Sequence, residues 1–294
     1  MIVDQIKELP RPPQRPSGGH KGTFGKTMLF GGSRGMSGAI SLAGMGALRS
    51  GAGLVYLVIP SGIASIVAAH EPAYLTIPLP EDDAGRITTI EYDDLKSQLE
   101  DKTSIALGPG CGQSEHLSHL FHDILLHEEK PIVVDADGLN LLAGMLDVLH
   151  EGPVPRVLTP HPGEFARLTN LPMKTITQHR QQVAAEFADT YDVTLVLKGE
   201  DTIVTDGHRL YVNTTGNSGM ATGGTGDVLT GIITGLLAQG MLAFEAASSW
   251  AFICMGLRGF GGTGIFSTGM ISSDLPCFLG KAWLQFYAFH DSGK

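Results

Sequence analysis

The chain has 294 residues, a formal net charge of −10 at pH 7 and no cluster of lysines or arginines. This acidic balance argues against a nucleic-acid-binding surface, and 43% hydrophobic with 17% charged residues excludes a disordered chain. The N-terminus lacks the apolar segment of a signal peptide, and the most apolar stretch, residues 231–256, is interrupted by Glu245. We therefore expect a cytoplasmic globular protein without a membrane span or a nucleic-acid partner.

The numbers of cysteine and glycine residues indicate further what kind of globular protein this is. Cys111, Cys254 and Cys277 are too few and too far apart for a disulfide framework or a metal-binding motif, so we expect reduced thiols. Glycine accounts for 39 of the 294 residues, against a usual share of about 7%. Because these glycines follow no collagen-like period, they indicate tight turns and close approach of the backbone to ligands.

Apolar β-like runs alternate with helix-like segments along the chain. Residues 9–19 are rich in proline and glycine, so residues 1–20 are expected to be a lead-in to one domain over residues 21–294. The predicted strands are 27–30, 54–59, 104–107, 131–135, 157–159, 193–197, 202–205 and 210–212. The predicted helices include 37–51 and 177–191, and Asp206-Gly207 indicates a hairpin. This alternation predicts an α/β fold with a central, mainly parallel sheet flanked by helices.

Glycine or a polar residue follows nearly every predicted strand. These strand ends are Gly31-Gly32, Gly108-Pro109-Gly110, Asp135 with Asp137, His161 and Lys198. In open α/β sheets, ligands bind beyond the carboxyl ends of the strands. Any single turn needs glycine or a capping residue for its own sake, but the whole set predicts a ligand site at this edge.

The motif Gly-Gly-Thr-Gly-Asp at residues 223–227 precedes an apolar, helix-like segment. It places Asp227 at a helix N-terminus, where free amides and the helix dipole favour an anion such as a phosphoryl group. A carboxylate there can take the proton of an attacking hydroxyl. Aspartate is also a good N-cap, but its glycine- and threonine-rich neighbours favour the catalytic interpretation.

Residues 217–231 resemble the anion-hole segment of the ribokinase-like superfamily and, more specifically, that of the NAD(P)H-hydrate dehydratase family. Other segments match this family in order along nearly the whole chain: 21–25, 31–33, 36–39, 108–110, 135–140, 159–164 and 198–202. Each match is weak alone, whereas their order and spacing together are specific. The resemblance implies a ribokinase-like fold.

The resemblance also implies roles for individual residues. Asp227 would be the catalytic base, and the anion hole would be formed by Gly224, Thr225 and Gly226. The adenine nucleotide would be contacted by Lys198, Gly199, Glu200, Asp201, Thr202 and Gly226. The hydrated nicotinamide cofactor would be contacted by Ala39, Gly110, His161 and Asp227.

Four further acidic or amide residues have open roles. Glu164 occupies the position where related kinases place an acid that organises magnesium through water, but it could equally be a first-turn acid favoured by the helix dipole. Asp135, Asp137 and Asn140 match the family as well. They could build turns through side-chain bonds to the backbone or bind a ligand.

The activity implied by the resemblance is ADP-dependent dehydration of (6S)-NADHX and (6S)-NADPHX to NADH and NADPH. AMP and phosphate would be released after phosphorylation of the C6 hydroxyl. Thr225 indicates ADP as the donor, because relatives that use ATP tend to carry glutamine there. Mg²⁺ and a homotetrameric assembly are also implied.

Three other functions compete with this one. A vitamin-precursor kinase of the same superfamily would share the anion hole, and a nucleotide-binding regulator would lack catalysis. A Rossmann oxidoreductase is disfavoured, because the glycines at residues 31–35 do not have the Gly-x-Gly-x-x-Gly spacing. The chain departs from the family at residues 257–271, which look shortened and carry Arg258 where many members have histidine. With only residues 1–20 before Lys21, we expect no epimerase activity.

Overall fold

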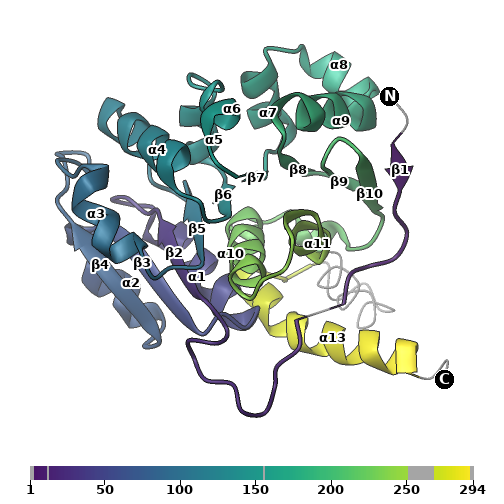
Figure 1. Cartoon of the computed structure of the whole chain (residues 1–294), viewed down its shortest axis with the longest axis horizontal. Helices are drawn as coiled ribbons and strands as arrows, with labels where there is room; N and C mark the ends of the chain where they lie inside the picture. Colours follow the sequence, from purple (N-terminus) through teal and green to yellow (C-terminus); the bar gives the residue numbers. More distant parts are fainter. Residues whose placement is uncertain (1–2, 12, 155, 251–267, 292–294) are drawn as a thin grey trace.

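A ten-stranded sheet forms the centre of the computed structural model, which describes residues 3–11, 13–154, 156–250 and 268–291. The strands follow the order β1-β10-β9-β8-β7-β6-β5-β2-β3-β4 (Figure 1). Their bounds are β1 Asp4–Gln5, β2 Lys26–Phe30, β3 Leu54–Pro60, β4 Tyr74–Leu79, β5 Ser104–Leu107, β6 Ile132–Val134, β7 Val157–Leu158, β8 Thr194–Leu197, β9 Thr202–Thr205 and β10 Arg209–Asn213.

Within the run β8-β7-β6-β5-β2-β3-β4, every pair of neighbouring strands is parallel. β9 is antiparallel to both β8 and β10, which confirms the hairpin at Asp206-Gly207. Successive side chains of β2 enter opposite cores: Met28 and Phe30 pack into one cluster and Leu29 into the other. The sheet is therefore buried on both faces, as the nearly continuous apolar runs predict.

Helices cover both faces of the sheet, so the predicted α/β fold is confirmed. One face carries α3 Tyr92–Leu99, α4 Glu115–His127, α5 Asp137–Leu142, α6 Val148–Glu151, α7 Pro162–Thr169, α8 Met173–Gln178 and α9 Arg180–Tyr191. The other carries α1 Ser37–Arg49, α2 Ala64–His70, α10 Thr225–Ala238, α11 Ala243–Ser248 and α13 Leu275–Asp291.

Three local features differ from the sequence-based expectations. The helix predicted over 177–191 is confirmed from Arg180 to Tyr191 as α9, but it is interrupted at His179, which adopts φ −127° and ψ 33° and separates α9 from α8. The edge strand β4 was not foreseen: its inner residues are partly exposed and it contains Pro78, so the apolar signal is weak. The lead-in contributes β1, which lies beside β10 although the two are far apart in sequence (Figure 1).

Cys111 is buried and Cys277 is exposed, and both are free thiols, as expected. Cys254 and Arg258 lie outside the described residues, as does most of the segment that departs from the family. Among the helices of the described residues, none combines the length and the apolar character that a membrane crossing requires.

Small residues allow α1 and α10 to pack closely. A Cβ added at Gly231 would lie 1.8 Å from the carbonyl oxygen of Ala43, and one at Gly46 would lie 2.4 Å from the carbonyl oxygen of Val228. Backbone therefore meets backbone at this crossing. Because α10 starts at the predicted ligand edge, the crossing also fixes where the helix N-terminus lies.

Replacing Gly231 with alanine should lower the free energy of unfolding by about 1–3 kcal/mol, because the new methyl group forces two packed helices apart. Urea denaturation measures this loss. Gly280, in α13, is the matched control: a Cβ there meets nothing within 4 Å. Gly280→Ala should be neutral or stabilising, since alanine is the better helix former. Equal effects of the two substitutions would contradict the close helix crossing.

Candidate functional site

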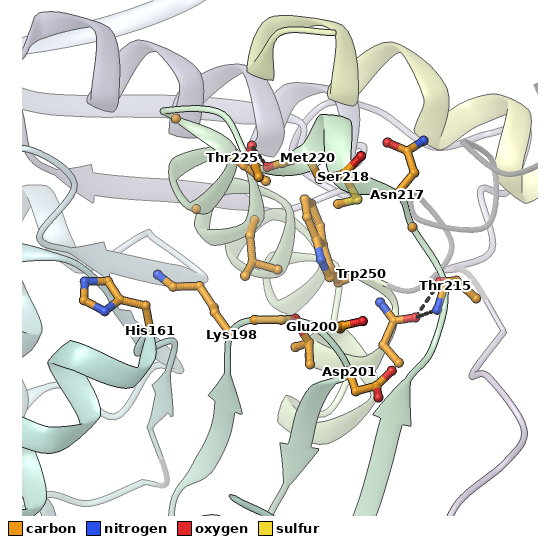
Figure 2. A pocket seen from close by; sticks show the side chains of 18 of the residues that line it. His161, Lys198, Glu200, Asp201, Thr215, Asn217, Ser218, Met220, Thr225 and Trp250 are labelled. Carbon is orange, nitrogen blue, oxygen red and sulfur yellow. Dashed lines mark hydrogen bonds between the residues drawn. The ribbon is translucent and has the colours of Figure 1, made fainter. Parts of the chain in front are cut away.

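The carboxyl ends of three neighbouring strands meet at one cavity of about 830 Å³. Asp135 follows β6, His161 lies shortly after β7, and Lys198 follows β8. The other walls are the 199–202 loop, the segment 213–221 and the first turn of α10, with Trp250. Figure 2 shows His161 and Lys198 on the strand-end side, and Thr225 and Met220 on the opposite wall. The edge of the sheet at which a ligand site is predicted therefore contains a cavity.

The N-terminus of α10 faces this cavity. Its N-cap, Gly224, has φ +90°, and a Cβ there would lie 2.4 Å from Leu42 Cδ1, so only glycine fits. Thr225 Oγ1 donates to the carbonyl oxygens of Met220 (3.0 Å) and Thr222 (3.1 Å) and thereby ties the preceding loop to the helix. The first amides of α10 have no acceptor within the helix, which makes this end a site for an anion.

A buried cluster of charges lies directly beside that helix end. Lys198 Nζ donates to Asp135 Oδ1 at 2.7 Å and lies 3.8 Å from Glu164 Oε2. The other carboxylate oxygen of Asp135, Oδ2, accepts from Thr230 Oγ1 at 2.7 Å. Burial lowers the pKa of Lys198, but Asp135 and Glu164 outweigh it, so the pKa is raised and the side chain stays cationic.

Asp227, in the first turn of α10, has the proton affinity of a base that works near neutral pH. Burial, and then the negative charge of Asp135, raise its pKa to about 7. The Lys198 ammonium acts in the opposite direction, while Glu164 and Asp137 add to the increase. A carboxylate of this kind can both accept and hold a proton under physiological conditions.

His161 is the N-cap of α7, and its ring Nδ1 accepts from the amides of Gly163 (3.0 Å) and Glu164 (3.2 Å). The ring is half-exposed and lines the cavity. Since Nδ1 is occupied as an acceptor, the proton of the neutral ring is on Nε2, which lies 3.4 Å from Glu164 Oε1. The histidine is thus held by its own helix in a fixed orientation.

Ten of the predicted site residues line the cavity, and Ala39, Gly110 and Glu164 do not. Ala39 and Gly110 lie together: a Cβ at Gly110, where φ is +63°, would lie 2.8 Å from Ala39 Cβ. They are found beyond β2 and β5, where the direction of strand succession in the sheet reverses. Open α/β sheets bind ligands in the crevice at such a point.

Glu164 forms a capping box with His161, since its Oε2 accepts from the His161 amide at 2.7 Å. Glu164 therefore lies in the first turn of α7, as that interpretation expects, and its role towards magnesium stays a prediction. Asp137 accepts from the amide of Gly112 at 2.9 Å, and Asn140 accepts from Arg167 Nε at 2.8 Å, so both support local structure. Among the described residues, no group of three or more His, Cys, Asp or Glu side chains could hold a metal ion.

Some residues around the cavity were not singled out from the sequence. Trp250 and Asn213 line it, although neither belongs to a recognisable motif. Arg180 donates to the carbonyl oxygens of Leu197 (3.3 Å), Lys198 (3.2 Å) and Glu200, and so holds the 198–202 loop from α9. Local sequence contains no signal for contacts of this kind.

Comparison with known proteins finds a match to the family model described as NAD(P)H-hydrate dehydratase over residues 27–256. The chain is 42% identical over 243 residues to the bifunctional NAD(P)H-hydrate repair enzyme Nnr of Moorella thermoacetica, covering 82% of this chain and 46% of that protein. It is 36% identical to the enzyme of the same description from Dictyoglomus turgidum, covering 84% and 48%. The chain thus spans about half the length of these curated relatives.

A solved structure is similar over nearly its full length. It is the ADP/ATP-dependent NAD(P)H-hydrate dehydratase of Bacillus subtilis, co-crystallised with ATP and Mg²⁺. The two share 27% sequence identity with a TM-score of 0.74, and the match covers 93% of this chain and 94% of that one.

Proposed function

The chain belongs to the NAD(P)H-hydrate dehydratase family, whose fold is ribokinase-like, and from this premise we propose that it repairs hydrated nicotinamide cofactors. The substrates are (6S)-NADHX and (6S)-NADPHX, and the products are NADH and NADPH. ADP donates the phosphoryl group, and AMP and phosphate are released. Two small-molecule substrates of this kind suit a large cavity at the ends of parallel strands.

The observation that carries this proposal is the placement of Asp227. Its carboxyl group has a pKa of about 7, because of partial desolvation and the negative charge of Asp135, and it lies in the first turn of a helix whose free amides face the cavity. A base and an anion site side by side are what transfer of a phosphoryl group to a hydroxyl requires.

In the first step, Asp227 accepts the proton of the C6 hydroxyl while that oxygen attacks the terminal phosphorus of ADP. An O–P bond forms at C6, and the bond to the bridging oxygen breaks with AMP as the leaving group. The anion hole of Gly224, Thr225 and Gly226 stabilises the negative charge on the phosphoryl oxygens through its backbone amides. Activation is needed because hydroxide is a poor leaving group.

In the second step, phosphate leaves with the C6–O bonding electrons, and the ring nitrogen lone pair supports the departure. Loss of a proton from C5 then restores the dihydronicotinamide double bond. The hydroxyl oxygen of the hydrate therefore leaves in phosphate, and one nucleotide phosphoryl bond is consumed for each cofactor repaired. His161, fixed as the cap of α7, contributes a ring N–H to bind the substrate.

The nucleotide is proposed to lie along Lys198, Gly199, Glu200, Asp201 and Thr202, with its terminal phosphate at Gly226. Gly199 has φ +134°, and Thr202 Oγ1 donates to its carbonyl oxygen at 2.8 Å, which shapes this loop. A Cβ at Gly226 would lie 3.2 Å from Lys198 Nζ, so the two groups are neighbours. Phosphate oxygens bound here would meet both the ammonium and the helix amides.

The residues present suit a magnesium ion that is held mainly by the nucleotide. Lys198 and Thr230 occupy both oxygens of Asp135, and the capping box engages Glu164. Mg²⁺ commonly keeps several waters and binds through substrate phosphates and one or two carboxylates. We propose Glu164 as such a carboxylate, acting through water. The ion would neutralise charge on the transferring phosphoryl group.

ADP is expected to be a better donor than ATP. The side chain of Thr225 is short and is turned back onto its own loop, at the position where glutamine accompanies ATP use in relatives. Initial rates with NADHX, Mg²⁺ and either nucleotide test this expectation by the recovery of reduced-nicotinamide absorbance. A clear preference for ATP would contradict the donor assignment. A stable phosphorylated product without recovered absorbance would instead indicate a small-molecule kinase.

The turnover number should fall as the pH drops through about 7. Asp227 must be ionised to accept a proton, and the pKa of about 7 follows from burial and from Asp135, Glu164 and Asp137, which outweigh Lys198. Below that pH, the protonated carboxyl group cannot act as a base. The measurement is kcat across the neutral range, with nucleotide affinity determined at each pH as the control. A flat profile with constant affinity would contradict the base assignment.

A further inference from the structure

We propose that Asp135 is a positioning residue that fixes the catalytic base Asp227 relative to the nucleotide loop, acting through Thr230 and Lys198. The inference rests on the proposed function, because it concerns how the same site is held in order. It assigns one role to a carboxylate that could, from sequence alone, have been a turn former or a ligand. We refer to Asp135, Thr230 and Lys198 as the brace.

The first arm of the brace sets the rotation of α10. Thr230 lies three residues after Asp227, so both side chains are on the same side of the helix. The hydroxyl of Thr230 is fully buried and donates to Asp135 Oδ2 at 2.7 Å. This bond ties the helix to the end of β6. Rotation of α10 about its axis would break it, and the same rotation would move the carboxylate of Asp227.

The second arm holds the start of the nucleotide loop. Lys198 Nζ donates to Asp135 Oδ1 at 2.7 Å, and Lys198 is the first residue after β8. Asp135 itself is 1% exposed and has no other role for its carboxylate oxygens among the contacts of the described residues. A buried carboxylate with both oxygens engaged adopts one geometry. The brace therefore links the end of β6 to α10, which carries the base Asp227, and to the end of β8, where the nucleotide loop begins.

The backbone next to Asp135 is also fixed. Ala136 has φ +49° and ψ −118°, a conformation that is unfavourable for alanine. It persists because the turn is held on both sides: the amide of Asp135 donates to the Leu107 carbonyl oxygen at 3.1 Å, and the carbonyl oxygen of Asp135 accepts from the Gly138 amide at 2.9 Å. An ordered turn of this kind keeps the Asp135 side chain pointed at α10 rather than at solvent.

The test uses three substitutions in one helix. Thr230→Val removes the hydroxyl at nearly constant volume, and Thr230→Ser restores it. Thr234→Val is the matched control, because Thr234 is also fully buried but donates to the Thr230 carbonyl oxygen at 2.6 Å, within the helix. Thr230→Val should lower kcat by about 10–100-fold, as misplacement of a catalytic group does. The nucleotide KM should change by less than about threefold.

Thr230→Ser should recover kcat to within about threefold of the wild type, and Thr234→Val should leave it unchanged. Hydrogen exchange across residues 221–233 gives a readout that needs no activity: it should be faster in Thr230→Val than in Thr234→Val. Equal kcat and equal exchange in the two valine variants would overturn the brace. If the wild type fails to dehydrate NADHX, the proposed function fails, and the exchange comparison still decides the brace.

Should Thr230→Val not fold, Asp135→Asn tests the same point. Asparagine preserves the volume but has one acceptor oxygen where aspartate has two, so with that oxygen accepting from Thr230 its amide group faces the Lys198 ammonium without an acceptor. The loss should again fall mainly on kcat, and a change confined to thermal stability would contradict the inference.

Discussion

Replacing Asp227 with asparagine should reduce kcat for NADHX dehydration by about 10²–10⁴-fold, the usual contribution of a general base. Asparagine has nearly the same shape but cannot accept the hydroxyl proton. Nucleotide affinity should change little, because the amides and Lys198 that face the phosphate remain in place. The experiment compares kcat with the dissociation constant for ADP in the same preparation.

The same variant should be at least as stable as the wild type. Burial and the neighbouring Asp135 raise the pKa of Asp227 to about 7, which means that the charged form is disfavoured in the folded protein. A neutral side chain avoids this cost. Thermal denaturation therefore separates a catalytic effect from unfolding. Near-wild-type turnover in a folded Asp227→Asn enzyme would exclude the general-base role.

Replacing Lys198 with methionine should cost about 3 kcal/mol or more of unfolding free energy, because it leaves a buried carboxylate without its partner. Asp135 is 1% exposed, and Glu164 lies nearby and is buried as well. The variant should also bind ADP weakly, since the ammonium faces the cavity where the phosphates are proposed to lie. Urea denaturation and nucleotide titration measure the two effects.

A double substitution isolates the electrostatic part of this loss. In Asp135→Asn/Lys198→Met both charges are removed, so the unfolding free energy should recover partly towards the wild type. Lys174→Met provides the control for an exposed lysine, where surface substitutions usually change stability by less than about 0.5 kcal/mol. A Lys198→Met variant as stable as Lys174→Met would show that Asp135 does not depend on its cation.

Residues defined by a local pattern were predictable from the sequence. Glycines before an apolar helix place Asp227 at a helix start, and the ends of parallel strands bring His161 and Lys198 to one edge of the sheet. Alternation of strands and helices likewise predicts the fold, because the central strands are buried on both faces. Such features are set by residues that are close together in the sequence, so a local pattern is enough to predict them.

Features that depend on distant partners, or on local geometry that no sequence pattern marks, were not predictable. Asp135 and Thr230 are 95 positions apart, and only the fold brings them together. The capping role of Glu164 depends on the geometry of His161, which the sequence leaves open between cap and ligand. His179 interrupts a helix-like pattern without proline or glycine, so nothing in the composition marks the break.

Transfer of the hydroxyl oxygen is the most direct test of the proposed chemistry. NADHX labelled with oxygen-18 at its C6 hydroxyl is incubated with the enzyme, Mg²⁺ and ADP, and the phosphate and NADH are then analysed by mass spectrometry. If the hydroxyl attacks phosphorus and later leaves as phosphate, the label appears in phosphate, in an amount equal to the NADH formed. Label recovered in water, with unlabelled phosphate, would contradict phosphorylation of the substrate.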